Sequence, residues 1–142
     1  MEFQTLLESR RSVRSYDASK TVTREQIKEI VEAGILAPSW KNSQTARYYC
    51  VIDEAAKEKF AKECLPEFNV NNSKGAGAYV ITTFVANRSG FDREGNPDNE
   101  CGNGWGYYDL GLHNENVILK AKELGLDTLS IEPKLMKGTI RC

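Results

Sequence analysis

Three arginines and three hydroxyl-bearing residues lie within residues 10–16, Arg-Arg-Ser-Val-Arg-Ser-Tyr. A guanidinium group presents a planar fork of N–H donors that matches the oxygens of a phosphate or of another planar anion. If the chain is extended here, Arg10, Ser12 and Arg14 face one side, and Arg11 is left to pair with an acidic neighbour. A short basic run is also typical of a solvated surface. The segment therefore predicts either an anion-binding site or a charged surface.

A second polar segment, residues 37–44 (Ala-Pro-Ser-Trp-Lys-Asn-Ser-Gln), lies where a helix is expected to give way to a strand. Ser39, Trp40, Asn42 and Gln44 offer a hydroxyl, an indole and two amides within one loop. Such groups suit the neutral edge of a flat heterocycle and its hydroxylated chain. Serine and asparagine also form helix-ending turns routinely, so an ordinary turn is an equally good interpretation.

A third segment, residues 102–109 (Gly-Asn-Gly-Trp-Gly-Tyr-Tyr-Asp), combines glycines with three aromatic rings. Trp105, Tyr107 and Tyr108 are candidate substrate-binding residues, because aromatic faces stack on planar molecules and glycines allow a lid to move. The alternative is that Trp105 and Tyr108 anchor the loop to the core. Asp109 is a candidate helix cap. We assign no role to His113, since a lone histidine in a helix is more often structural than catalytic.

Length and composition limit the function classes. With 142 residues, residues 1–142 are expected to form a single domain, and a formal net charge of −1 argues against nucleic acid as a partner. The sequence shows neither an apolar run of membrane-spanning length nor a leader-like start, so a cytoplasmic protein without membrane contact is expected. The four cysteines form no C-x-x-C pair and one histidine is too little for a zinc site. Cys50 is expected to be a buried thiol.

Hydrophobic periodicity predicts a layered α+β or α/β domain. Thr23 and Gln26 match a capping box at the start of one helix, and Pro38 follows its expected end. The run at 78–86 is apolar enough for a central strand covered on both faces. The remaining expected elements are helices at 2–10, 54–64 and 108–124, strands at 46–53 and 126–131, and loops at 66–77 and 87–106.

Together the polar segments resemble those of the FMN-dependent nitroreductase family, and the resemblance extends from the first helix to about Leu129. Each motif is moderately specific, whereas the order and spacing of the set are more specific. The motifs are residues 10–16, residues 35–39 followed by Asn42 and Gln44, Asp109-Leu110-Gly111, and residues 121–126.

The resemblance implies an α+β fold, namely a three-layer α-β-α sandwich with a central, mainly antiparallel sheet. It also implies a homodimer with FMN at the interface, taking hydride from NADH or NADPH and passing it to nitroaromatics, quinones or similar acceptors. No catalytic protein side chain is expected, because the flavin carries the chemistry. The implied FMN-binding residues are Arg10, Arg11, Ser12 and Arg14 from one subunit and Pro38, Ser39, Trp40, Asn42 and Gln44 from the other.

After Leu129 the sequence departs from the continuation that is typical of this family. Residues 130–142 are therefore expected to form an atypical tail of the single nitroreductase-like domain. This departure favours one alternative to an enzyme, which is a degenerate or truncated, non-catalytic domain that binds a flavin or serves in assembly.

Overall fold

Two antiparallel strands, β1 (Ala46–Val51) and β2 (Tyr79–Phe84), form the sheet of the computed structural model, which describes residues 1–134. β-Branched and aromatic residues dominate both strands, as a pleated surface favours. The register pairs Ala46 with Phe84 and Val51 with Tyr79. Every residue of β2 is half-buried, so its cover is less complete than the apolar run predicts.

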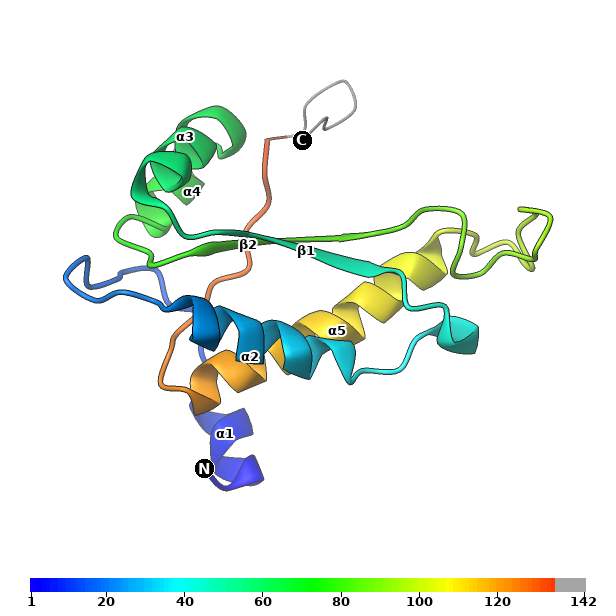
Figure 1. Cartoon of the computed structure of the whole chain (residues 1–142), viewed down its shortest axis with the longest axis horizontal. Helices are drawn as coiled ribbons and strands as arrows, with labels where there is room; N and C mark the ends of the chain where they lie inside the picture. The colour runs from blue at the N-terminus through cyan, green and yellow to red at the C-terminus, as the bar shows by residue number, and fades with distance from the viewer. Residues whose placement is uncertain (135–142) are drawn as a thin grey trace.

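The helices α2 (Arg24–Ile35) and α5 (Gly104–Glu123) pack against each other beneath the strands (Figure 1). Their contact contains the main apolar cluster, Ile30, Val117 and Ala121, with Tyr48 of β1 packed against it. Figure 1 shows α3 (Glu54–Cys64) and α4 (Glu67–Asn72) on the other side of the strands. The short α1 (Phe3–Ser9) lies near the end of α5. None of the helices in residues 1–134 combines the length and apolar character needed to cross a membrane.

Local sequence signals account for several helix ends. The expected capping box is confirmed, because the Thr23 hydroxyl accepts from the Gln26 amide at 3.1 Å while the Gln26 side chain accepts from the Thr23 amide. The Asp53 side chain caps α3 by accepting from the Ala56 amide at 3.0 Å. Gly125 follows α5 with a φ of 77°, the left-handed conformation that glycine adopts without steric cost.

The third strand expected at 126–131 is not formed. Instead, one isolated parallel bridge joins Ser12 to Thr128, and the Val13 amide donates to the Thr128 carbonyl at 3.0 Å. A strand needs a neighbour whose backbone groups line up over several residues, and here the pairing ends after one bridge. Residues 1–134 form a domain of mixed helices and strands whose sheet has two strands. This is less than the central sheet of the three-layer sandwich that the resemblance implies. Most of the atypical tail, residues 135–142, lies outside the described residues.

Three further sequence expectations are wrong. Residues 67–72 form α4 instead of a loop. The last long helix begins at Gly104, before the predicted 108, so Asp109 lies inside α5 and is not its cap. Cys50 is exposed on β1 next to the exposed Tyr49, because this stretch of the strand has no cover.

Candidate functional site

One carboxylate of α5, that of Asp109, fixes the polar loop at residues 39–44 between α2 and β1. The Trp40 amide, in the 3₁₀ turn η1 (Trp40–Asn42), donates to Asp109 Oδ1 at 3.0 Å and to Oδ2 at 3.1 Å. The Ser89 hydroxyl donates to the same Oδ2. Asp109 and Ser89 are 2% and 1% exposed, so these charge-assisted bonds are shielded from water. Asp109 therefore ties the 39–44 loop and the start of the 87–103 loop to α5.

The backbone of the 39–44 loop is unusual, because three residues other than glycine have positive φ angles. The values are 45° for Lys41, 54° for Asn42 and 52° for Gln44. Such conformations cost energy and persist only where the surroundings enforce them, which is common at ligand sites. Here the Ser39 hydroxyl accepts from the Gln44 amide at 2.9 Å, and Gln44 Nε2 donates to Asn42 Oδ1 at 3.1 Å. Pro38, which is exposed, precedes this arrangement.

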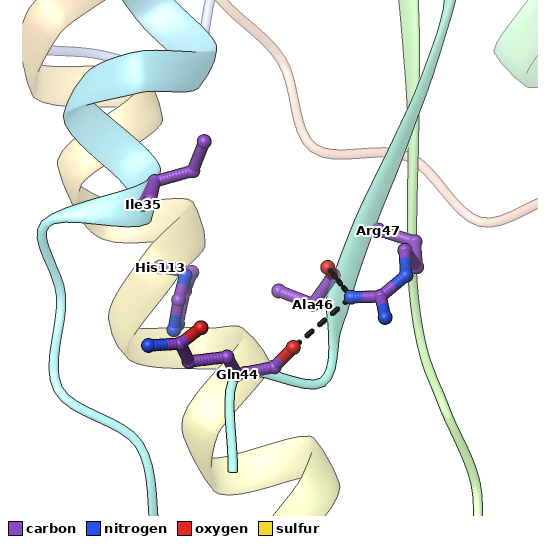
Figure 2. Close-up of a pocket in the computed structure, with 5 residues that line it drawn as sticks. All are labelled: Ile35, Gln44, Ala46, Arg47 and His113. Atoms are coloured by element: carbon purple, nitrogen blue, oxygen red, sulfur yellow. Dashed lines mark hydrogen bonds between the residues drawn. The ribbon is translucent and has the colours of Figure 1, made fainter. Parts of the chain in front are cut away.

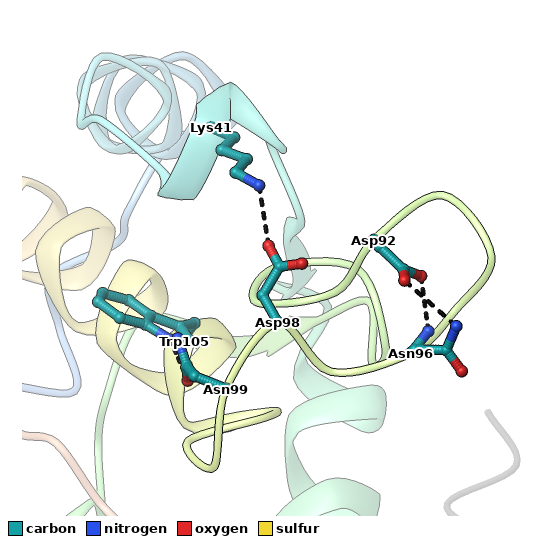
Figure 3. Close-up of polar contacts among 6 residues, drawn as sticks. All are labelled: Lys41, Asp92, Asn96, Asp98, Asn99 and Trp105. Atoms are coloured by element: carbon teal, nitrogen blue, oxygen red, sulfur yellow. Dashed lines mark hydrogen bonds and ion pairs between the residues drawn. The ribbon is translucent and has the colours of Figure 1, made fainter.

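The long 87–103 loop is cross-linked to the 39–44 loop (Figure 3). Lys41 Nζ lies 2.8 Å from Asp98 Oδ2 and 4.2 Å from the centre of the Trp40 ring. Trp105 Nε1 donates to Asn99 Oδ1 at 3.1 Å, so this indole holds the loop against the first turn of α5. Specific contacts thus join the 87–103 loop to the 39–44 loop and to the first turn of α5.

The three candidate aromatic residues lie in the first turns of α5. Trp105 is half-buried and anchors the neighbouring loop, as one of the two sequence interpretations holds. Tyr107 and Tyr108 are 70% and 60% exposed. The Tyr107 ring packs edge-on against Phe84 of β2, with centroids 4.7 Å apart. Two aromatic rings are therefore presented to the surface by a helix and not by a mobile lid.

Beside this loop, α5 carries the chain's only histidine (Figure 2). His113 is 4% exposed, and neither ring nitrogen makes a well-aligned hydrogen bond among the described residues. Burial lowers the pKa of His113 below its usual value, although the charge of Asp109 and the nearby Gly34 backbone of α2 act in the opposite direction. The imidazole lines a cavity of about 240 Å³, which is also lined by Ile35, Gln44, Ala46 and Arg47.

The basic segment, residues 10–16, lies directly after α1. Within residues 1–134, Arg10, Arg11 and Arg14 form no ion pair. Arg11 Nη1 donates to the Arg10 carbonyl at 2.7 Å, so the expected acidic neighbour for Arg11 is not seen there. Ser12 is fixed by its bridge to Thr128. The arrangement leaves cationic donors exposed on a backbone that is locally extended.

Arg14 lines a second cavity, of about 320 Å³, which we call the Arg14 cavity. Its volume lies at the lower end of the range for small-molecule sites, roughly 300–1,000 Å³. Its lining combines a guanidinium, two amides, an exposed aromatic ring, apolar side chains and one carboxylate. The other lining residues are Phe68, Asn69, Asn72, Leu129, Ser130, Ile131 and Glu132.

Sequence reasoning missed the two amides of this cavity, because residues 66–77 were expected to be a loop. Asn69 is 4% exposed and its Nδ2 donates to the Glu132 carbonyl at 2.8 Å, which connects α4 to the segment after α5. Two signals could have revealed α4. Pro66 stands directly before the helix, and Glu67 places a negative charge in its first turn.

Within one chain, the structure does not bring the two polar segments together. The 39–44 loop contacts the first half of α5, whereas the basic segment is bridged to Thr128 after its end (Figure 1). From Asp109 to Glu123, α5 rises by about 20 Å at 1.5 Å per residue. A ligand that contacts both segments closely would therefore bind the basic segment of one chain and the 39–44 loop of a second copy of the chain.

Comparisons with known proteins agree on one family. The sequence model of the Nitroreductase family matches residues 7–136. The Bacillus subtilis protein YdgI, named as a candidate NAD(P)H nitroreductase, is 33% identical over 84 residues, which are 59% of this chain and 39% of YdgI. The chain thus spans about two fifths of that relative.

Solved structures give the same result. A candidate nitroreductase from Desulfovibrio desulfuricans, in complex with FMN, superposes with a TM-score of 0.62 at 27% identity, covering 85% of this chain and 62% of that one. A second, from Exiguobacterium sibiricum and also in complex with FMN, gives a TM-score of 0.71 at 23% identity over 92% of this chain and 74% of that one. The second likeness concerns the fold alone.

Proposed function

Because the chain belongs to the nitroreductase family, we propose that it is an FMN-dependent oxidoreductase using NADH or NADPH and a nitroaromatic, quinone or similar acceptor. The observation that carries this proposal is the Arg14 cavity, where a guanidinium without an ion pair in residues 1–134 lies beside neutral amides and apolar surface. That combination suits a flat ligand with a phosphate and hydroxyl groups. The FMN complex of the Desulfovibrio desulfuricans neighbour supports the same ligand.

The donors of the Arg14 cavity support FMN as its ligand. Arg14 can bind a phosphate through two parallel N–H bonds, with Arg10 and Arg11 adding positive charge to the same segment. Asn72 can serve hydroxyl groups, since an amide both donates and accepts, whereas the Nδ2 of the buried Asn69 already donates to the Glu132 carbonyl. Glu132 would repel a phosphate but can accept from a hydroxyl. The phosphate is therefore expected at Arg14, on the side away from the Glu132 carboxylate.

The protein's own residues bind and orient, and we assign no catalytic acid or base. When bound, FMN supplies the chemistry that moves a hydride from NAD(P)H to the acceptor. In this proposal Ser12 contributes a hydroxyl beside Arg14, while Ser39, Asn42 and Gln44 present neutral hydrogen-bonding groups to the heterocycle. Pro38 and Trp40 belong to the same loop and are expected to contact FMN as well.

We further propose that the working form is a homodimer in which these two sets of residues come from different subunits. The separation of the segments along α5 supports this, because one chain presents them at different ends. Large apolar side chains are also exposed, and a contact between subunits could cover some of them. They include Phe3 at 67%, Ile35 at 62% and Leu36 at 83% exposure. Tyr107 and Tyr108 are then available to contact the acceptor.

Titration of the full chain with FMN, followed by quenching of flavin fluorescence, tests the proposal. Arg14→Ala is expected to weaken binding by about 1–3 kcal/mol, the scale of a lost hydrogen bond to a charged group. Arg24→Ala is the matched control, because Arg24 is exposed at the start of α2 and lines neither cavity. Equal affinities for the two variants would refute the role of Arg14. Binding without NAD(P)H oxidation would favour the non-catalytic alternative.

A further inference from the structure

The end of α2 lacks the usual features that satisfy the last carbonyl groups of a helix. Its last turn contains no basic residue, and none of residues 36–40 has a positive φ. Pro38 has no N–H to donate to the Gly34 carbonyl, which is its partner in a regular helix. Leu36 and Ala37 instead donate to the carbonyls three residues back, those of Ala33 at 3.3 Å and Gly34 at 3.1 Å. Such bonds have poorer geometry, so these carbonyls can use a further donor.

Asn116 of α5 supplies that donor from outside α2. Its Nδ2 donates to the Ala33 carbonyl at 3.2 Å, and the residue is half-buried. Apolar packing holds this end of the helix only on one side, since Ile35 is 62% and Leu36 83% exposed. A side-chain amide therefore attaches the last turn of α2 to α5.

The same face of α5 carries a stripe of polar residues, whose spacing of four, three and four positions places them on one side of a helix. Its members are Asp109, His113, Asn116 and Lys120. At one end of the stripe, Lys120 Nζ lies 3.8 Å from Glu29 Oε2 of α2. Nearer the other end, His113 lies beside the Gly34 backbone. The two helices thus run in opposite directions, and the stripe follows α2 to its last turn.

Beyond the end of α2, the stripe reaches the 39–44 loop. There the Trp40 amide donates to both carboxylate oxygens of Asp109. From Asp109 to Asn116, α5 rises by about 10 Å. The chain from Ala33 to Trp40 is therefore attached to α5 at both of its ends, and Figure 1 shows this stretch leaving α2 and reaching η1. One attachment alone would leave the stretch free to pivot about it.

We infer that Asn116 is a positioning residue for the 39–44 loop, which it places by holding the last turn of α2 at the Ala33 carbonyl. Without this donor, the last turn frays and the loop is held at one end only, by Asp109. The consequence for FMN rests on the proposed function, which makes this loop part of the flavin site. The attachment of α2 to α5 does not rest on it.

Amide hydrogen exchange of the full-length protein without ligand tests the attachment. Asn116→Leu keeps the size of the side chain and removes the donor, and we expect the Leu36 and Ala37 amides to exchange about tenfold faster, which is the scale of one hydrogen bond. Asn114→Leu is the matched control, because Asn114 is a half-buried asparagine of α5 whose Nδ2 donates to Thr82 Oγ1 of β2 at 3.1 Å. Unchanged exchange in Asn116→Leu, or an equal increase in both variants, would overturn the inference.

A second variant separates the hydrogen bond from packing. Asn116→Asp keeps the shape, but at neutral pH its carboxylate has no donor and faces the Ala33 carbonyl at the negative end of α2. We expect exchange at Leu36 and Ala37 to rise at least as much as in Asn116→Leu. The NMR signal of the Trp40 amide should move in both variants, because the loop is then held at one end only. Wild-type exchange rates in Asn116→Asp would contradict the inference.

The effect on the candidate site is measured by titrating the same proteins with FMN. We expect the dissociation constant to rise about tenfold in Asn116→Leu and to stay within about threefold of wild type in Asn114→Leu. Equal constants for these two variants would refute the positioning role. If the wild type binds no FMN, the proposed function fails, while the exchange rates and the Trp40 signal still decide the role of Asn116.

Discussion

Asp109 is the residue whose removal should disturb the candidate site most, because it holds two loops at once. Its carboxylate accepts from the Trp40 amide through both oxygens, at 3.0 and 3.1 Å, and from the Ser89 hydroxyl. Hydrogen bonds to a charged group contribute about 1.5–3 kcal/mol each, and water can replace part of what is lost. We therefore expect Asp109→Ala to lower the free energy of unfolding by about 3–5 kcal/mol, which is typical for removing one partner of a buried charged contact.

Urea denaturation of the full chain measures this change by linear extrapolation. Asp109→Asn keeps the shape and one acceptor but turns an NH₂ group toward one of the two donors, so a smaller loss of about 1.5–3 kcal/mol is expected. This variant keeps the test usable if Asp109→Ala does not fold. Asp92→Asn is the control, since Asp92 is an exposed carboxylate that binds Asn96 within the neighbouring loop (Figure 3). A loss in Asp109→Ala no larger than in this control would refute the reasoning.

Two further predictions concern the contact between α2, β1 and α5. Gly34→Ala should destabilise the fold by about 1–3 kcal/mol, because a Cβ there would lie 2.8 Å from Tyr48 Oη and from Val117 Cγ2. Gly111→Ala in α5 meets nothing within 4 Å and should stabilise by roughly 0.5–1 kcal/mol in the same urea assay, so equal effects would contradict this packing. The pKa of His113 is lowered by burial, so the unfolded chain takes up a proton first as the pH falls. The wild type should therefore lose stability as the pH falls below about 6.5, the usual pKa of histidine, by a fraction of the limit of about 1.4 kcal/mol per pH unit, and His113→Gln should lose less. Parallel pH curves for the two proteins would show that the imidazole is not held neutral.

Where a local signal alone decides the structure, the sequence predicts it well. The Thr23–Gln26 capping box places the start of α2, and Asp53 begins α3 as expected for a helix at 54–64. The apolar spacing of Val117 and Ala121 predicts the buried face of α5. These features depend on residues within a few positions of each other.

Features that depend on distant partners were not predictable in the same way. Residues 126–131 have the composition of a strand, but the structure provides a backbone neighbour only around Ser12. The composition of residues 102–107 is typical of a loop, yet α5 begins at Gly104. The bond between Asn99 and Trp105 fixes the 87–103 loop to the start of this helix. Likewise, Asp109 is a plausible cap in sequence, and only the packing of three segments shows its actual partners.

The candidate site was predictable in its residue types and less so in its assembly. The positions of Ser39, Asn42 and Gln44 in one compact loop agree with the expectation from their spacing. The Arg14 cavity, in contrast, needs Asn69 from α4 and the backbone after α5, which lie 55 and about 115 residues from Arg14 in the chain. Their roles in binding FMN stay predictions until binding is measured.

The most direct test of the central claim is to follow the visible absorption of FMN bound to the purified full chain in the absence of oxygen. After removal of free flavin, we expect the FMN band to coelute with the protein, to be bleached by NADH or NADPH, and to return when a quinone or nitroarene is added. Arg14→Ala should retain less flavin than Arg24→Ala. A folded wild-type protein that retains no FMN, or retains it without bleaching by either nucleotide, would contradict the account.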